Sequence, residues 1–140
     1  MAGETTQADE YSATAFQGRS RQECVLDISH EVTTGELELA DVNQLGKVPK
    51  GAIYTGGFIA TDDLDSATSL DLVVGDVNDP DGLQATGTVG QAAGITQFSG
   101  PYITNKQTTT SEETVSITVN AAAGTAVAGT IRVVVRYYVL

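Results

Sequence analysis

The residues best suited to chemistry gather in one acidic stretch, TDDLDSATSLDLVVGDVNDPDG, which spans residues 61–82. It contains no lysine or arginine and seven aspartates: Asp62, Asp63, Asp65, Asp71, Asp76, Asp79 and Asp81. Carboxylates at this density suit a hard cation such as calcium, which prefers oxygen ligands. The spacing does not fit an EF-hand loop, because Pro80 stands where the third ligand of DVNDPDG should be and no glutamate closes the loop. A calcium site without fixed spacing stays open as an alternative.

Turn formation accounts for the same aspartates without a metal. Asp, Asn, Pro and Gly each favour turns for reasons of backbone geometry, and NDPDG combines all four. DDLDS fits a loop between strand patterns at residues 52–60 and 66–74, and Asp71 alternates with Leu70 and Leu72, so that it points to solvent. The sequence therefore predicts surface turns here, with no metal and no cofactor.

Other catalytic constellations are absent from the sequence. The single histidine, His30, has no HExxH companion and is predicted to lie on the surface. Cys24 alternates with Leu26 and Ile28 and is predicted to be a core residue. His30 lies six residues from Cys24, which is about 20 Å along a strand, so the two cannot form a catalytic pair there. Neither LGKVP nor GTVGQAAG has the spacing of a phosphate-binding loop. We predict that the protein is not an enzyme.

Apolar residues alternate with polar ones from residue 22 onward, which is the pattern of half-buried strands. No sustained helical period occurs; LADVNQL is at most one turn, and residues 82–111 hold one or two short strands between long loops. Residues 21–140 are predicted to form one all-β domain, an antiparallel β-sandwich with a jelly-roll-like order. The segments that carry the pattern are ECVLDIS, GELELA, AIYTGGFIA, SLDLVVG, TVSITVN and TIRVVVRYYVL.

Residues 1–20 show no period and contain only two large apolar side chains, Tyr11 and Phe16. Such a segment cannot build a core of its own. It is either a frayed terminus or an extended N-terminal arm that docks on a neighbouring subunit, with Tyr11 or Phe16 as the anchor. The segment has neither the basic nor the apolar region of a secretory signal, and we expect it not to be one.

Charge excludes two classes of partner. Eighteen acidic residues against seven basic ones give a formal net charge of −11. Nucleic-acid binding requires clustered Lys and Arg, and here the basic residues are scattered, so we predict no nucleic-acid partner. The same charge opposes adsorption to anionic membranes, and no apolar run approaches the roughly 20 residues of a membrane span.

Two segments of the chain resemble small structural proteins of tailed bacteriophages. They are VPKGAIYTGGFIATDDLDSATSLDLVVGDVNDPDG at residues 48–82 and AGTIRVVVRYYVL at residues 128–140. The similarity is to capsid decoration, or cement, proteins with a β-sandwich body. It implies a protein on the capsid surface of the virion that binds the major capsid protein and associates with copies of itself, often as a trimer. The acidic surface agrees with a place outside the packaged DNA.

The mixed face of the last strand is where we expect a partner. Arg132, Arg136 and Tyr138 share that face with Val134 and Leu140, and both arginines are predicted to find carboxylate partners within the protomer or across an interface. Aromatic and arginine side chains are the usual anchors of interfaces. The full set of predicted partner-binding residues is Tyr11, Phe16, Arg19, Arg21, Arg132, Arg136 and Tyr138.

Two other functions are compatible with the sequence. A neck, tail or fibre-base component of the virion would have the same β-rich composition. A glycan-binding module would need exposed aromatic side chains along a groove, and the available ones are Tyr54, Phe58, Phe98, Tyr102, Tyr137 and Tyr138.

The interpretation of the aspartates as turn residues predicts that calcium does not stabilise the protein. A ligand that binds only the folded state raises its stability, and 1 kcal/mol corresponds to roughly 4 °C of melting temperature in a domain of this size. We expect less than about 1 °C difference between millimolar calcium and chelator in a thermal melt. A rise of several degrees would reinstate a metal site among the aspartates.

Overall fold

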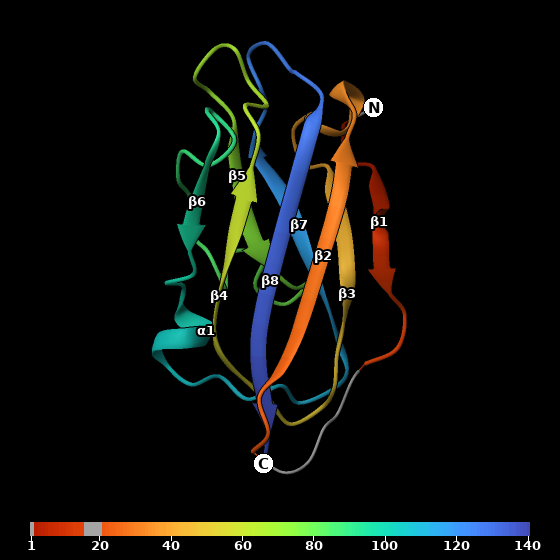
Figure 1. Ribbon diagram of the computed structural model, residues 1–140, viewed down its shortest axis with the longest axis vertical. Coiled ribbons are helices and arrows are strands. Elements are labelled where there is room, and N and C mark those ends of the chain that lie inside the picture. Colours follow the sequence, from red (N-terminus) through yellow and green to blue (C-terminus); the bar gives the residue numbers. More distant parts are fainter. Residues whose placement is uncertain (1, 16–20) are drawn as a thin grey trace.

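The computed structural model describes residues 2–15 and 21–140, and these form a sandwich of two four-stranded sheets (Figure 1). One sheet has the order β1-β3-β7-β5, and the other, which we call the β8 sheet, has the order β2-β8-β4-β6. The strands are β1 Thr5–Ser12, β2 Cys24–Val32, β3 Val42–Val48, β4 Ala52–Thr61, β5 Asp71–Gly75, β6 Gly94–Gln97, β7 Glu113–Ala121 and β8 Gly129–Val139, with short helices η1 Thr34–Glu36 and α1 Pro101–Thr104.

Successive strands alternate between the two sheets, so every connection crosses from one sheet to the other. The pairings within the sheets are antiparallel except for β1 with β3, which is parallel. This strand order is that of a jelly roll, in which the sheet β2-β8-β4-β6 faces the strands β3-β7-β5. β1 is an additional strand at the edge of the sheet that contains β3. The predicted all-β sandwich is confirmed.

The core lies between the sheets, where the period-two pattern predicted it. Val115, Ile117 and Val119 of β7 are buried, and Val133 and Val135 of β8 are buried opposite them. Cys24 is buried in the same cluster, as expected. A glycine bulge in β4 completes the packing. A Cβ on Gly57, which has φ of 145°, would collide with the carbonyl oxygen of Val134, so no larger residue fits there.

Two predictions about residues 35–48 were wrong. GELELA does not form a strand: η1 and turns occupy it, and Leu37 is buried while Leu39 is exposed. The strand is β3, formed by the next residues, where LADVNQL was expected to be at most a helical turn. Asp41 decides this boundary, because its carboxylate accepts the N–H groups of Glu38 and Glu4 and so fixes the chain as it enters β3.

Residues 5–12 belong to the sandwich, although the sequence showed no strand pattern there. β1 buries only Ala8, and its remaining side chains are polar or half exposed, so the period-two signal is weak. Its acidic side chains explain its place: Glu10 accepts the N–H of Ser29, and Asp9 accepts that of Glu31. Both donors lie on the free edge of β2, which is thereby covered. The division of the chain at residue 20 stays a prediction, and residues 16–20 lie outside the described part.

His30 is buried, which corrects its predicted surface position. Its Nδ1 accepts the N–H of Asp9 at 3.2 Å, and its Nε2 lies 2.7 Å from Oε2 of Glu36. The ring therefore joins β1, β2 and η1. Burial of a histidine requires partners for both ring nitrogens, and sequence spacing does not reveal them because Asp9 is 21 residues away.

The inner face of β8 gives a direct test of the fold. Val133→Asp places an unpaired charge between the sheets, and we expect the variant to be unfolded or insoluble. Ser116→Asp is the control, because Ser116 alternates with the buried side chains of β7 and is partly exposed. Circular dichroism melts measure both. A cooperative melt for Val133→Asp at the wild-type temperature would mean that the faces of β8 are reversed.

Candidate functional site

The aspartates of residues 61–82 serve mainly as acceptors for backbone N–H groups. Within the described residues no three His, Cys, Asp or Glu side chains are grouped so as to hold a metal ion. The prediction that the aspartates occupy turns fits the loops, but two of them are buried rather than solvated. Those two, Asp65 and Asp76, organise opposite ends of the sandwich.

Asp65 is fully buried and joins two loops that are distant in sequence. Its carboxylate accepts five backbone N–H groups at 2.9–3.2 Å, those of Ala67, Ser69, Leu70, Gly124 and Thr125. These hydrogen bonds, above all that of Thr125, hold the pKa of Asp65 well below its ordinary value against the opposing effect of burial. The group has no oxygen left for a ligand, so its role is structural.

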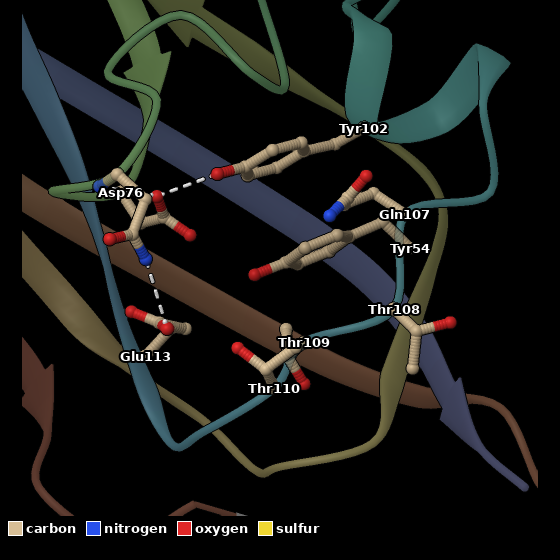
Figure 2. Close-up of a pocket in the computed structure, with 9 residues that line it drawn as sticks. Tyr54, Asp76, Tyr102, Gln107, Thr108, Thr109, Thr110 and Glu113 are labelled. Carbon is tan, nitrogen blue, oxygen red and sulfur yellow. Dashed lines mark hydrogen bonds between the residues drawn. The ribbon is translucent and has the colours of Figure 1, made fainter.

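A pocket of about 170 Å³ opens at the other end of the sandwich, where β8 ends (Figure 2). Four segments build it: the start of β4, the loop after β5, α1 with the residues after it, and the loop that leads into β7. Its lining consists of Tyr54, Asp76, Asn78, Tyr102, Gln107, Thr108, Thr109, Thr110 and Glu113.

Two buried carboxylates face this pocket, Asp76 at 5% exposure and Glu113 at 8%. Oδ1 of Asp76 accepts the N–H groups of Asn78 and Asp79 and the hydroxyl of Tyr102 at 2.7 Å. Oε1 of Glu113 accepts the amide of Asn78 and a serine hydroxyl. Asn78 thus links the two acids, and each keeps its second oxygen clear of any hydrogen bond or ion pair with the described residues.

Two stacked tyrosines form the opposite wall of the pocket. The rings of Tyr54 and Tyr102 are 5.7 Å apart and inclined by 4°. Tyr54 is only 2% exposed, yet its hydroxyl has no hydrogen-bond partner among the described residues. Burial, followed by the charges of Asp76 and Glu113, raises the pKa of Tyr54 far above its ordinary value, so the hydroxyl stays protonated. Figure 2 shows this hydroxyl pointing toward the two acids.

The predicted partner-binding residues do not converge on this pocket. Arg132 pairs with Asp27 through two hydrogen bonds of 2.8–3.0 Å and lies over the ring of Phe58. Arg136 and Tyr138 are half-buried on the same outer face of β8, and no carboxylate of the described residues is in ion-pair range of Arg136. The prediction that the arginines pair with carboxylates within the protomer therefore holds for Arg132.

The remaining predicted residues lie elsewhere. Tyr11 is half-buried on β1, at the edge of the opposite sheet. Arg21 is exposed, and its N–H bonds to the carbonyl oxygen of Val139, which places it beside the end of β8. Phe16 and Arg19 lie outside the described residues. The structure thus places the backbone of Arg21 beside the end of β8, whereas Tyr11 lies in the opposite sheet.

Two tyrosines of the pocket were predicted only as candidate glycan contacts, and Glu113 and the threonines were not predicted as site residues at all. Glu113 lies 37 residues beyond Asp76 and in no motif. The sequence held one usable signal, because Glu113 is the first residue of a strand whose following inward-facing residues are apolar. A charged side chain at the start of such a strand is partly buried and needs hydrogen-bond or ion-pair partners. The tyrosines do not form an open aromatic groove: Tyr54, Tyr102, Tyr137 and Phe98 are all buried.

No protein-family model matches the chain, and no curated protein sequence matches it. Two solved structures do. A chain in the capsid asymmetric unit of cyanophage Pam1 is 30% identical with a TM-score of 0.75, and the match covers 91% of this chain and 92% of that one. The chain belongs to a family of phage capsid proteins. A chain in the capsid of Ralstonia phage GP4 is 25% identical with a TM-score of 0.77, over 97% of this chain and 98% of that one.

Membership in this family makes the chain a structural component of a virion. Both matches extend over nearly the whole of the related chains, 98% in the Ralstonia phage capsid and 92% in the cyanophage capsid. None of the described helices is long and apolar enough to cross a membrane.

The buried carboxylate of Asp65 gives a test of how the loops of this capsid protein are held. Asp65→Asn replaces one acceptor oxygen with an NH₂ group that faces backbone donors, so we expect the melting temperature to fall by roughly 10 °C or more. Asp63→Asn is the control, because Asp63 is exposed and, within the part of the chain that the structure describes, accepts only the N–H of Asp65.

The pH dependence of the same pair is a second readout. The pKa of Asp65 is lowered on folding, so its stabilisation is complete above the unfolded value of about 4 and is lost as the pH falls below it. The difference in melting temperature between wild type and Asp65→Asn should therefore narrow below about pH 4. An equal difference at pH 7 and pH 3 would show that the charge of Asp65 is not what stabilises the loops.

Proposed function

We propose that this chain is a capsid decoration protein that binds the shell built by the phage's major capsid protein and stabilises it. The observation that carries the proposal is the whole-length match to small chains within two phage capsids. A subunit of 140 residues with one sandwich is suited to adding onto a shell made by a larger protein. The resemblance of residues 48–82 and 128–140 to decoration proteins supports the same role.

The outer face of the β8 sheet is the surface that we propose contacts the shell. Val25 of β2 is 53% exposed there and pairs in register with Arg136. Tyr138 and Phe58 add half-buried aromatic area on the same face. An arginine without an acidic partner among the described residues, beside aromatic and apolar side chains, has the composition of an interface hot spot. Arg132 is already paired with Asp27 and has less to offer a partner.

Stabilisation by such a protein is mechanical. Each copy buries area across the boundary between shell subunits, and many copies multiply a modest contact energy. We further propose that the protein forms a symmetric homo-oligomer, a trimer by its resemblance to decoration proteins, which would place several contact faces on one attachment point. The net charge of −11 suits the outer surface of a capsid, away from packaged DNA.

Copy number in purified virions distinguishes decoration from the other positions in the particle. Hundreds of copies per particle, measured by quantitative mass spectrometry against the major capsid protein, are expected for a decoration protein. Six or twelve copies would instead assign the chain to the neck, tail or fibre base, and the proposal would fail.

The proposed contact face has its own test. We expect Arg136→Ala to weaken co-sedimentation with particles stripped of the native protein by about tenfold or more, the effect of losing one hot-spot side chain. Arg132→Ala is the matched comparison on the same strand, and we expect it to lose less because Asp27 already engages that guanidinium. Wild-type binding by Arg136→Ala would move the contact to another face of the sandwich.

A further inference from the structure

We propose that the pocket between Tyr54, Tyr102, Asp76 and Glu113 binds a primary alkylammonium group. A lysine side chain presented by a neighbouring protein and a small free alkylamine both carry this group. The inference concerns a different surface from the outer face of the β8 sheet. Its central test uses the isolated protein and so does not depend on the decoration role.

The first support is the pair of carboxylate oxygens left open. Oδ1 of Asp76 and Oε1 of Glu113 are each occupied by protein donors. No hydrogen bond or ion pair within the described residues engages Oδ2 of Asp76 or Oε2 of Glu113, and both side chains line the pocket. Buried carboxylates are normally paired with a cation or fully hydrogen-bonded. The pocket beside these two carboxylates has room for a cation, and none of the described residues supplies one.

The second support is independent of the acids. The hydroxyl of Tyr54 is buried and has no hydrogen-bond partner among the described residues, although it lies among polar groups in the pocket. Leaving a buried hydroxyl unpaired costs about 1–3 kcal/mol. A bound donor would use the lone pairs of this oxygen, and the carboxylates beside it would attract a donor that is positively charged. The orphaned hydroxyl and the two acids therefore call for the same kind of ligand.

The surroundings strengthen the negative field at the pocket. Asp79 and Asp81 lie in the loop that follows Asp76, and their carboxylates add negative charge to that end of the sandwich. The nearby Lys47 does not relieve this field at the pocket, because its ammonium is paired at 3.4 Å with Glu112, the exposed neighbour of Glu113. A cation entering the pocket is thus favoured by charges beyond its direct contacts.

Geometry favours an ammonium over a metal ion or a guanidinium. A divalent metal needs six or more oxygen ligands for calcium or a near-octahedral set for magnesium, and the described residues form no metal-holding group of three acids, histidines or cysteines. A guanidinium fork binds both oxygens of one carboxylate, and here each carboxylate has only one oxygen open. An ammonium has three separate donors, which match Asp76 Oδ2, Glu113 Oε2 and Tyr54 Oη.

The remaining walls suit the alkyl stem. A water-sized group occupies about 30 Å³, so a pocket of about 170 Å³ has space for the five heavy atoms of butylammonium. The stacked rings of Tyr54 and Tyr102 offer apolar area for the methylene groups. Aromatic faces also attract cations.

Titration of the full chain with butylammonium chloride, followed by NMR at constant ionic strength against sodium chloride, tests the proposal. We expect saturable shifts of the Thr109 and Thr110 amides, with a dissociation constant on the order of 1 mM for so small a ligand. Glu113→Gln should weaken binding about tenfold because it removes a charged acceptor. Glu112→Gln is the matched control and should bind as wild type does.

Tyr54→Phe keeps the ring stacking and removes only the unpaired hydroxyl, so it tests the pocket even if Glu113→Gln does not fold. We expect it to weaken butylammonium binding severalfold without lowering the melting temperature. Three results would overturn the proposal: no saturable butylammonium shifts at the pocket, calcium chloride saturating the pocket when butylammonium does not, or undiminished binding by Tyr54→Phe and Glu113→Gln.

The source of the ammonium is assigned by a separate experiment that rests on the proposed attachment to capsids. If Glu113→Gln and added butylammonium both weaken co-sedimentation with stripped particles, the ligand is a lysine of the shell. If neither does while the isolated protein binds butylammonium, the ligand is a free alkylamine. Failure of the wild-type protein to bind particles at all would count against the decoration role and leave the pocket chemistry supported.

Discussion

Carboxylates that accept backbone N–H groups hold this sandwich together wherever the strand ladders end. Because each connection crosses between sheets, the chain leaves its hydrogen-bonding partners at every strand end and must find others. Asp65 supplies five such bonds in one loop pair, Asp41 fixes the entry to β3, and Asp9 and Glu10 cover the free edge of β2. The acidity of the protein is therefore in large part structural.

The same arrangement separates the two ends of the molecule by function. At one end both oxygens of Asp65 are engaged by backbone donors, so this carboxylate is closed to ligands. At the other end the described residues engage only one oxygen of Asp76 and one of Glu113, and they offer no partner to the hydroxyl of Tyr54. This fold uses carboxylates as internal hydrogen-bond acceptors. Where two of them lie side by side and each keeps one oxygen without a donor in the described part of the chain, they form a pocket that attracts cations.

The proposed attachment to a capsid calls for a rigid body with few exposed anchors, and the outer face of the β8 sheet would provide both. Its central strand pairs with β2 over residues 129–137 and with β4 over residues 131–139, so that Arg136 and Tyr138 are presented on a backbone that cannot move far. Side chains held on a rigid backbone lose less conformational entropy on binding, so a small interface can still bind with useful affinity. Arg132 holds the adjoining surface in the same way, because its guanidinium forms an ion pair with Asp27 and lies over the ring of Phe58.

The sequence by itself determined the all-β class, the core faces of β7 and β8, the burial of Cys24 and the resemblance to phage structural proteins. These follow from period-two alternation, which is local and strong in long strands. Only the tertiary structure decided that β1 joins a sheet, that β3 replaces the strand expected at residues 35–40, and that His30 and Asp65 are buried. It alone brought Tyr54 and Glu113 to one pocket. Each of these depends on partners far away in the chain, and contacts between distant residues leave no periodic trace in the sequence.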